Sequence, residues 1–179
     1  MAQSTILITG ATQGIGFESA RVLAGEPDVH ILIAARDVAR ARPIAEALGP
    51  HAGVVSLDLA SLAGIREGAA SVRQSLQAGE RPPLAGMVLN AGMQTASGPL
   101  QYTQDGFEIA FGTNHLGHFL LVNLLLPVMA QGRIVFTASG THDPDTIDGR
   151  FNKPVFTSAR DLAFAADGTP PKMSHLQRL

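Results

Sequence analysis

Five short apolar runs recur along the chain up to residue 138, and segments with helical spacing separate them. Nearly continuous apolar runs are typical of strands that are buried on both faces of a parallel sheet. Strands that alternate with helices favour right-handed crossovers. We therefore predict an α/β domain with a doubly wound parallel sheet, whose strands fall at Ile6–Ile8, Val29–Ala35, Gly53–Asp58, Leu84–Asn90 and Arg133–Ala138.

Three of the intervening segments have clear helical patterns. Phe17–Leu23 follows the first predicted strand after a glycine-rich turn. Ser61 can cap a helix, and Thr103 can cap a longer one that ends at Pro127. The apolar positions that define these two helices are Ile65, Ala69, Val72 and Leu76 in the first and Phe107, Phe111, Leu116, Leu120 and Leu124 in the second.

The helix after the second strand is less regular. Asp37 has the residue type and position of an N-cap, but Pro43 lies too deep for a first-turn proline. This helix therefore either begins nearer Arg42 or bends at the proline. Beyond residue 138 the pattern is lost, apart from a helix-like piece at Ser158–Ala166. We expect one domain over residues 1–179, with a core at 1–138 and an irregular loop or lid at 139–179.

Composition narrows the class of protein. The chain has 179 residues, 45% of them hydrophobic, and a net charge of −2, so we predict neither a basic nucleic-acid surface nor an acidic tail. It has no cysteine, which excludes a disulfide framework and a cysteine-based metal site and fits a cytoplasmic location. We predict no metal site. The most apolar stretch, Phe119–Met129, is shorter than the roughly 20 residues that span a bilayer.

A glycine-rich turn joins the first strand to the first helix. Glycines at 10, 14 and 16 let the backbone turn tightly and approach a ligand closely. A helix that begins near Gly14 presents its free N–H groups and the positive end of its dipole to a pyrophosphate. The alternative is a strand–helix turn without a ligand. The residues that we expect to contact a dinucleotide here are Gly10, Thr12, Gln13, Gly14, Ile15 and Gly16.

The residues after the second strand bear on the choice of cofactor. In open doubly wound sheets, ligands bind outside the carboxyl ends of the strands. An acidic residue at this position holds a ribose 2′-hydroxyl, whereas an arginine can hold a 2′-phosphate. Arg36 stands here with Arg40 nearby, so we favour NADP over NAD. Two alternatives stay open: Arg36 as an ordinary surface arginine, and Asp37 as a ribose ligand rather than a helix cap.

Two further strand ends carry candidate cofactor contacts. Asp58 and Leu59 follow the third strand, where a carboxylate can accept a hydrogen bond from the adenine amine. Asp58 can equally serve as a cap for the helix that follows. Asn90, Ala91 and Gly92 follow the fourth strand and form a small turn, where backbone can approach a cofactor ribose.

Asn114 and Ser139 are the candidates for chemistry. Ser139 follows the fifth strand and would place its hydroxyl over the crevice. Asn114 lies in the middle of a predicted helix, although asparagine is a poor helix former. Its position therefore indicates either a functional role or a buried polar contact.

Taken together, these motifs resemble the short-chain dehydrogenase/reductase family over about residues 4–142. The segment Phe111–Phe119 with Arg133–Val135 is most similar to the branch that holds retinol dehydrogenases, WW-domain oxidoreductase and light-dependent protochlorophyllide reductase. The resemblance implies a Rossmann fold with strand order 3-2-1-4-5 and hydride transfer between a nicotinamide and a carbonyl or alcohol carbon. It also implies that Ser139 orients the substrate oxygen and that Asn114 supports a water in a proton relay. A nucleotide-sugar epimerase or another Rossmann protein fits the Asn90, Asn114 and Ser139 set less well.

The chain departs from the family at the general acid/base, which is a tyrosine followed four positions later by a lysine. Its single tyrosine, Tyr102, precedes Ser139, and neither Lys153 nor Lys172 follows a tyrosine. The chain stops about where its relatives reach this motif. We therefore expect a truncated reductase without the later strands and helices, whose own activity is doubtful. The alternative is a dinucleotide-binding protein without catalysis.

Two expectations follow from the missing motif. The histidines His115, His118 and His142 are candidate replacement bases, although helix or loop roles suit each of them better. Loss of later elements would leave apolar surface uncovered along the long helix at residues 103–126. That surface predicts self-association.

Overall fold

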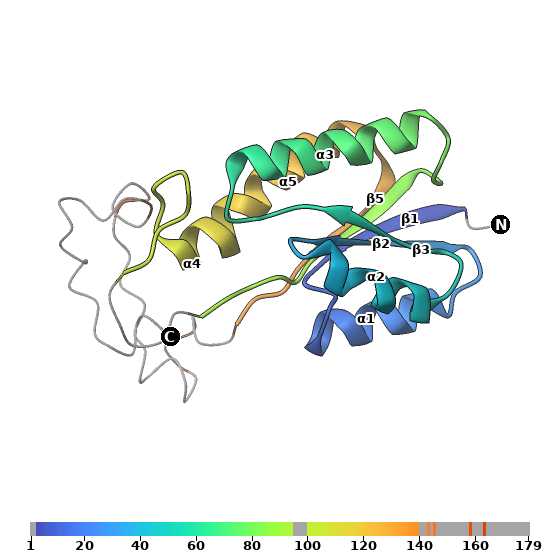
Figure 1. Ribbon diagram of the computed structural model, residues 1–179, viewed down its shortest axis with the longest axis horizontal. Coiled ribbons are helices and arrows are strands. Elements are labelled where there is room, and N and C mark those ends of the chain that lie inside the picture. The colour runs from blue at the N-terminus through green and yellow to red at the C-terminus, as the bar shows by residue number, and fades with distance from the viewer. Residues whose placement is uncertain are drawn as a thin grey trace.

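The computed structural model describes residues 3–94 and 100–139, together with residues 143, 145, 158 and 163. At its centre lies a five-stranded sheet with the order β3-β2-β1-β4-β5, in which every neighbouring pair is parallel (Figure 1). The predicted fold class and strand order are therefore confirmed. The strands are β1 (Ser4–Thr9), β2 (Val29–Ala35), β3 (Ala52–Ser56), β4 (Leu84–Leu89) and β5 (Met129–Phe136).

The strand ends differ most from the prediction at β5. This strand begins at Met129, whereas the sequence pattern placed its start at Arg133. Met129 pairs with Leu84, and the register then shifts before Gly86 pairs with Arg133. The irregularity explains the difference, because a bulge lets polar and glycine residues join a strand without continuing the apolar pattern.

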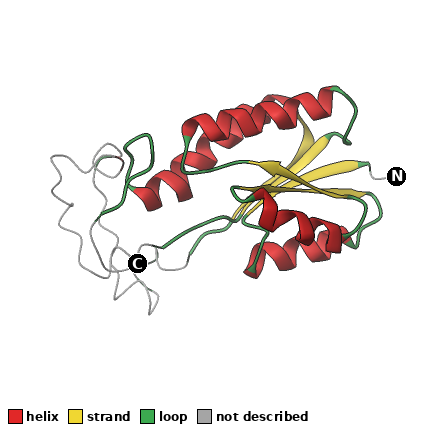
Figure 2. Ribbon diagram, in the orientation of Figure 1, coloured by secondary structure: helices red, strands yellow, loops and turns green. Residues whose placement is uncertain are grey.

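Helices cover both faces of the sheet (Figures 1 and 2). On one face lie α1 (Gly14–Ala24) and α2 (Val38–Leu48), and on the other lie α3 (Leu62–Gln77) and α5 (Gly117–Leu125). Alternation along β1 supplies both cores, because successive side chains of a strand point to opposite faces. Leu7 packs in the α3–α5 core and Ile8 in the α1–α2 core, both without solvent exposure.

Asp37 begins helix α2, as predicted. Its side chain accepts a hydrogen bond from the Arg40 N–H at 3.0 Å. Pro43 lies inside the helix, so the alternative start near Arg42 is wrong. The inward positions Ala41 and Ala45 are buried against the sheet, and this packing holds the helix together despite the donor that proline lacks.

The helix expected from Thr103 begins later. Glu108 is the N-cap of α4 (Ile109–Phe111), and its carboxylate accepts the N–H groups of Ala110 and Phe111 at 3.0 and 2.7 Å. Thr103 instead stabilises the preceding turn by accepting the Phe107 N–H at 3.1 Å. The prediction of Thr103 as the cap is therefore wrong, because a glutamate one turn along competes for the same role.

From α4 the chain continues without a break through the π-helix η1 (Gly112–Leu116), α5 and the 3-10 helix η2 (Leu126–Val128). This run, Ile109–Val128, has 20 residues and is long and apolar enough to cross a membrane by length and composition. The shortness of Phe119–Met129 therefore does not decide by itself whether this run could span a membrane. In the structure one side of the run packs on the sheet, with Leu121 and Leu125 fully buried.

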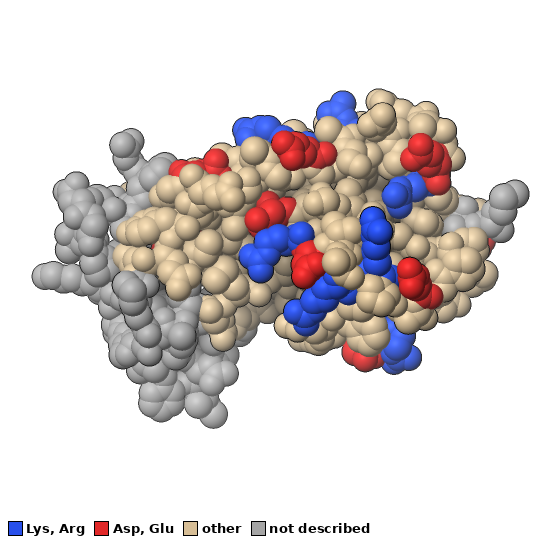
Figure 3. Space-filling view, viewed as in Figure 1, with Lys and Arg blue, Asp and Glu red and all other residues tan. Residues whose placement is uncertain are grey.

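Charged side chains of both signs are interspersed on the face drawn in Figure 3. The segment at residues 139–179, including its predicted helix at Ser158–Ala166, lies largely outside the described residues. Within it, Ala163 is buried and its carbonyl accepts the Glu108 N–H at 3.0 Å. His142, Lys153 and Lys172 also lie outside the described residues.

Candidate functional site

The glycine turn between β1 and α1 brings the tips of two central strands into contact. Gly10 has φ +68°, and a Cβ atom there would lie 2.7 Å from the Cα atom of Ala91. A Cβ atom on Gly16 would collide with the Gly10 carbonyl oxygen and the Asn90 side-chain amide. Gly14 has φ +59° and has open space where its Cβ atom would stand. Glycine is therefore required at these positions for two reasons, close packing at Gly10 and Gly16 and backbone conformation at Gly10 and Gly14.

Helix α1 has no side-chain cap at its N-terminus. Its N-cap residue, Gln13, makes no capping hydrogen bond and instead accepts one from Arg40 Nη2 at 3.0 Å. The first turn contains no acidic residue. Helices α2, α3 and α4, by contrast, are capped by the side chains of Asp37, Ser61 and Glu108. The amide groups at the start of α1 are thus well suited to an anionic ligand.

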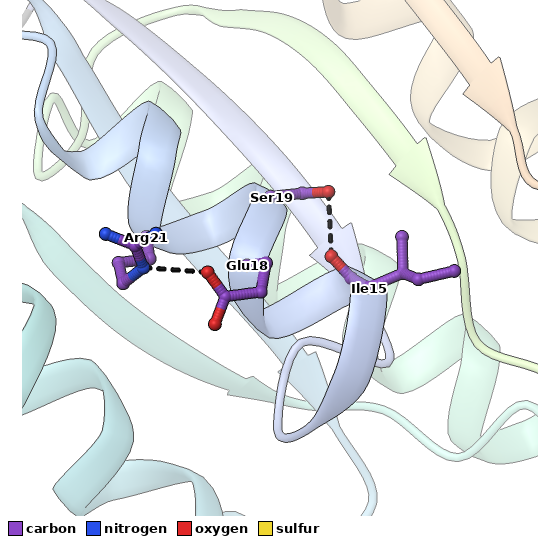
Figure 4. Close-up of polar contacts among 4 residues, drawn as sticks. All are labelled: Ile15, Glu18, Ser19 and Arg21. Atoms are coloured by element: carbon purple, nitrogen blue, oxygen red, sulfur yellow. Dashed lines mark hydrogen bonds and ion pairs between the residues drawn. The ribbon is translucent and has the colours of Figure 1, made fainter.

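Ile15 is the side chain of this first turn that Figure 4 draws. Ile15 projects away from the helix axis and is 72% exposed, and its carbonyl accepts the Ser19 hydroxyl at 2.8 Å. Glu18 pairs with Arg21 at 2.8 Å one turn further along the helix, on the side away from Ile15.

A cavity of about 500 Å³ opens beside the turn, at the carboxyl ends of β1, β2 and β3. Asp37 and Arg40 lie in its wall with several predicted cofactor contacts. Asp58 Oδ1 accepts the Ala60 N–H at 3.0 Å, while Ser61 caps α3. Asp58 thus shapes the turn before the helix and is not its N-cap. The predicted residues in this cavity are Gly10, Thr12, Arg36, Asp58, Leu59, Ala91 and Gly92.

A second cavity of about 680 Å³ adjoins the first, and the two share Ala91, Gly92 and Met93. Its predicted lining residues are Ile15, Asn90, Asn114 and Ser139. The structure therefore brings together most of the predicted residues in two neighbouring cavities. Gln13, Gly14 and Gly16 form the adjacent start of α1 rather than a cavity wall.

Asn90 connects three strand tips. Its Nδ2 donates to the Gly10 carbonyl at 3.3 Å, and its Oδ1 accepts from the Thr137 hydroxyl at 3.2 Å. The backbone N–H groups of Asn90 and Ala91 both donate to Thr9 Oγ1 at 3.0 Å. These bonds fix the tips of β1 and β4 and the residue that follows β5 relative to one another.

Asn114 lies inside the π-helix η1, a distortion that is frequent at functional sites. Its side chain pairs with the backbone of Met93, accepting from the N–H at 2.9 Å and donating to the carbonyl at 2.8 Å. Asn114 therefore makes a polar contact, but an exposed one, so the expectation of a buried contact is wrong; its partner is a loop segment that borders both cavities. Its role toward a water molecule stays a prediction.

His118 is 3% exposed, and both of its ring nitrogens are engaged. One lies 3.0 Å from Thr9 Oγ1 and the other 3.0 Å from the Asn114 carbonyl oxygen. Burial lowers the pKa of His118, and the nearby charge of His115 lowers it further, whereas the hydrogen bond to Asn114 acts in the opposite direction. A buried ring with both nitrogens occupied is not placed to act as a replacement base.

Sequence reasoning missed the roles of several residues. Thr9 binds the backbone after β4, and Met93 binds Asn114. A threonine at the end of an apolar run gives little indication that its hydroxyl has such a role. Thr113 lines the first cavity, and within the described part of the chain its Oγ1 is a buried side-chain atom without a hydrogen-bond partner. Buried polar atoms are usually paired, so an orphan beside a cavity points to a ligand.

Tyr102 does not belong to the candidate site. It forms an isolated bridge with Glu108, is 42% exposed and lines neither cavity. It does not take the place of the family's tyrosine beside Ser139.

The family model for short chain dehydrogenases matches residues 4–147. This chain belongs to that family. It is 38% identical to the chloroplastic protochlorophyllide reductase of Chlamydomonas reinhardtii and 36% identical to that of Daucus carota. Both matches cover 94% of this chain but only 43% of the relative, so the chain spans less than half the length of these proteins.

Solved structures agree with the family assignment. An uncharacterised protein from Mycobacterium paratuberculosis matches with a TM-score of 0.72 and 34% identity, over 92% of this chain and 53% of its own. The RhlG–NADP complex of Pseudomonas aeruginosa matches with a TM-score of 0.58 and 29% identity, over 72% of this chain and 48% of its own. A metagenomic short-chain oxidoreductase in complex with NADP shares the fold, with a TM-score of 0.66 and 24% identity over 80% of this chain and 65% of its own.

Proposed function

We propose that this chain binds NADP and forms the cofactor-binding part of an oxidoreductase that transfers hydride between the nicotinamide and a carbonyl or alcohol carbon. One observation carries the proposal: two adjoining cavities meet beside the uncapped N-terminus of α1. Family membership and the NADP-bound structural neighbours support the same conclusion.

The residues present fit a dinucleotide. A diphosphate beside Gly14 would accept hydrogen bonds from the amide groups at the start of α1, where no side-chain cap competes for these donors. The first cavity, whose wall includes Arg36, Asp58 and Leu59, would hold the adenosine half. Thr113 Oγ1 would gain there the partner that it lacks.

Arginine at the end of β2 favours NADP over NAD. Arg36 and Arg40 both lie in the wall of the first cavity. Asp37 is occupied in capping α2, which leaves it less suited to a ribose hydroxyl than the alternative interpretation required. A guanidinium recognises a 2′-phosphate through charge-assisted hydrogen bonds.

The second cavity would hold the nicotinamide half beside Ser139. When bound, the reduced nicotinamide supplies a hydride to the carbonyl carbon of a substrate. The Ser139 hydroxyl would donate a hydrogen bond to the substrate oxygen, and Asn114 lies in the same cavity wall. The oxygen must also receive a proton, which the family delivers through its tyrosine.

The alternative function is dinucleotide binding without turnover. The position of Tyr102, outside both cavities, favours it for this chain by itself. A carbonyl-reductase assay distinguishes the two. We expect binding of NADPH without reduction above background, and turnover that Ser139→Ala abolishes would instead show that this chain is a complete catalyst.

Titration of the nicotinamide emission of NADPH and NADH tests binding itself. The chain has no tryptophan, so changes in cofactor emission are not overlaid by tryptophan fluorescence. We expect saturable binding of NADPH that is tighter than that of NADH. Equal affinity would overturn the assignment of NADP, and binding of neither cofactor would overturn the proposed function.

We further propose a small carbonyl or alcohol substrate, a cytoplasmic location and a homo-oligomer. The composition supports the location, and the exposed apolar residues support the homo-oligomer.

A further inference from the structure

Thr9 sits at the centre of a hydrogen-bond network that joins the two cavities. Its hydroxyl oxygen receives two backbone N–H groups, from Asn90 and Ala91, each at 3.0 Å. A hydroxyl has two acceptor sites and one hydrogen to donate. Both acceptor sites are therefore used, and the third neighbour, the His118 ring nitrogen Nε2 at 3.0 Å, can only accept the Thr9 hydrogen.

This count fixes the tautomer of His118. If Nε2 accepts from Thr9, a neutral ring must carry its proton on Nδ1. Nδ1 lies 3.0 Å from the Asn114 carbonyl oxygen, which is an acceptor. All hydrogen bonds of the network are then satisfied in one direction, from the backbone of Asn90 and Ala91 through Thr9 and His118 to Asn114.

We propose that His118 is a positioning residue, which acts through Thr9 to hold the turn at Asn90–Gly92 in the geometry that binds the dinucleotide, and that acid releases this turn. The proposal rests on the proposed function, because Ala91 and Gly92 border both cavities. His118 also lies in the wall of the second cavity, and the proposal gives it a role in cofactor affinity through Thr9.

Protonation would break the network at a defined point. An imidazolium donates from both nitrogens, so its Nε2–H would face Thr9 Oγ1, whose acceptor sites are already taken. One backbone N–H of the turn would have to leave Thr9, or the Thr9 hydrogen would lose its acceptor. A buried donor without an acceptor is unfavourable, so the turn is expected to move instead.

The surroundings of His118 offer an added proton little compensation. Thr9 of β1 presents an uncharged hydroxyl to it. The titratable neighbour with an electrostatic effect on the ring is His115, whose positive charge would oppose a second one. The face of α3 that packs toward α5 carries Ile65, Ala69 and Val72, which are apolar.

The pKa of His118 is lowered in the folded chain, chiefly by burial. A group whose pKa is lowered on folding stabilises the fold above its ordinary value, here 6.5, and this contribution is lost as the pH falls through the folded pKa. Affinity for the cofactor is expected to fall over the same interval, since the protonated state no longer holds the turn.

The first test is the tautomer, which needs neither a variant nor a cofactor. In long-range ¹⁵N–¹H correlation spectra of the full chain near pH 7.5, Nδ1 of His118 should behave as a protonated nitrogen and Nε2 as an unprotonated one. Amide hydrogen exchange of Asn90 and Ala91 should lose protection on acidification. The opposite tautomer, or protection that is independent of pH, overturns the proposal whether or not a dinucleotide binds.

The second test compares two substitutions of His118, one that can replace the acceptor at Nε2 and one that cannot. His118→Gln places an acceptor near the position of Nε2, whereas His118→Asn is too short to reach Thr9. NADP⁺ serves as the ligand for calorimetry because reduced nicotinamides decompose in acid. His115→Gln is the matched control, since His115 is exposed on the same helical run.

We expect His118→Asn to bind NADP⁺ about tenfold more weakly than the parent near neutral pH, with His118→Gln and His115→Gln close to the parent. As the pH falls below 6.5 the parent should weaken more steeply than His118→Gln, by about tenfold for each pH unit below the folded pKa of His118. The 2′-phosphate titrates near pH 6, but it does so equally in both proteins and cancels in the comparison. Identical pH dependence of the parent and His118→Gln overturns the proposal. Failure of the parent itself to bind NADP⁺ overturns the proposed function instead.

Discussion

The two edges of the sheet differ in how fully they are covered. Beside the first cavity, the edge strand β3 packs against α2 and α3, and Val55 is 7% exposed. Beside the second cavity, the edge strand β5 leaves Val135 and Phe136 51% and 59% exposed. The edge beside the cavity that we propose for the adenosine half of a dinucleotide is thus covered more completely than the edge beside Ser139.

We expect the largest loss of stability and of cofactor binding from substitutions in the glycine turn between β1 and α1. In Gly16→Ala the new Cβ atom collides with the Gly10 carbonyl and the Asn90 amide, so we expect lost NADPH binding and a fall of about 1–3 kcal/mol in the free energy of unfolding. Gly14→Ala is the matched control, because its Cβ atom meets nothing and only the positive φ opposes it.

Gly14→Ala should lower stability by about 1–2 kcal/mol through its positive φ, and it should keep more NADPH binding than Gly16→Ala because its Cβ atom collides with nothing. Urea unfolding and fluorescence titration measure the two quantities separately. If Gly16→Ala binds NADPH like the parent, the close contact between the tips of β1 and β4 is not needed for the site.

Arg36 is the next most sensitive position. Arg36→Ala should weaken NADPH about tenfold to a hundredfold and leave NADH unchanged, because charge-assisted hydrogen bonds to the 2′-phosphate are lost. Arg42→Ala removes an exposed arginine of the same segment that lies in neither of the two cavities, and it should change neither affinity. A parallel loss of NADPH and NADH affinity in Arg36→Ala would show that the arginine serves the fold and not the phosphate.

The exposed edge strand β5 leads to a prediction about self-association. Exposed apolar side chains at Phe119, Leu126, Val135 and Phe136 confirm that apolar surface is open along the long helix and β5. We expect the chain to self-associate, and Phe136→Glu to shift it toward the monomer in sedimentation velocity, since a charge on an edge strand opposes pairing. Val22→Glu is the control, because Val22 is 62% exposed on α1, across the sheet from the long helix. Equal association of both variants with the parent would place the contact elsewhere.

The smallest effect is expected at Thr113. Thr113→Val removes a buried hydroxyl without a partner, so the free chain should gain about 1 kcal/mol in stability. The same change should weaken NADPH about fivefold, because the ligand loses its hydrogen bond. Opposite signs in thermal unfolding and calorimetry would identify a cofactor contact. A loss of stability would show instead that the hydroxyl has a partner within the protein.

The same contrast explains how far the sequence predicted the structure. The turn at Gly10–Gly16 and the bounds of β2 follow from local rules, because glycine spacing and apolar runs encode them directly. The start of the long helix does not follow from local rules, since Thr103 and Glu108 both have side chains that can cap a helix. Only tertiary contacts decide which of the two does so.

The network at Thr9 shows the limit most clearly. The sequence around His118 suits a base or a helix residue, and nothing in its neighbours along the chain indicates a threonine 109 positions away. Asn114 was singled out because asparagine is unfavourable in a helix, but its partner, Met93, carries no polar side chain to signal the contact. Such contacts depend on which strand tips meet, and composition does not encode that.

The central claim is that the amides at the start of α1 hold the diphosphate of a dinucleotide. The most direct measurement is the change in backbone amide resonances of the full chain on titration with NADP⁺. We expect the largest saturable shifts at Gly14, Ile15 and Gly16, with further shifts at Arg36 and Gly92. Shifts confined to the cavity between α2 and β3 that is lined by Arg42 and Gly49, with the amides of α1 unchanged, would contradict the account.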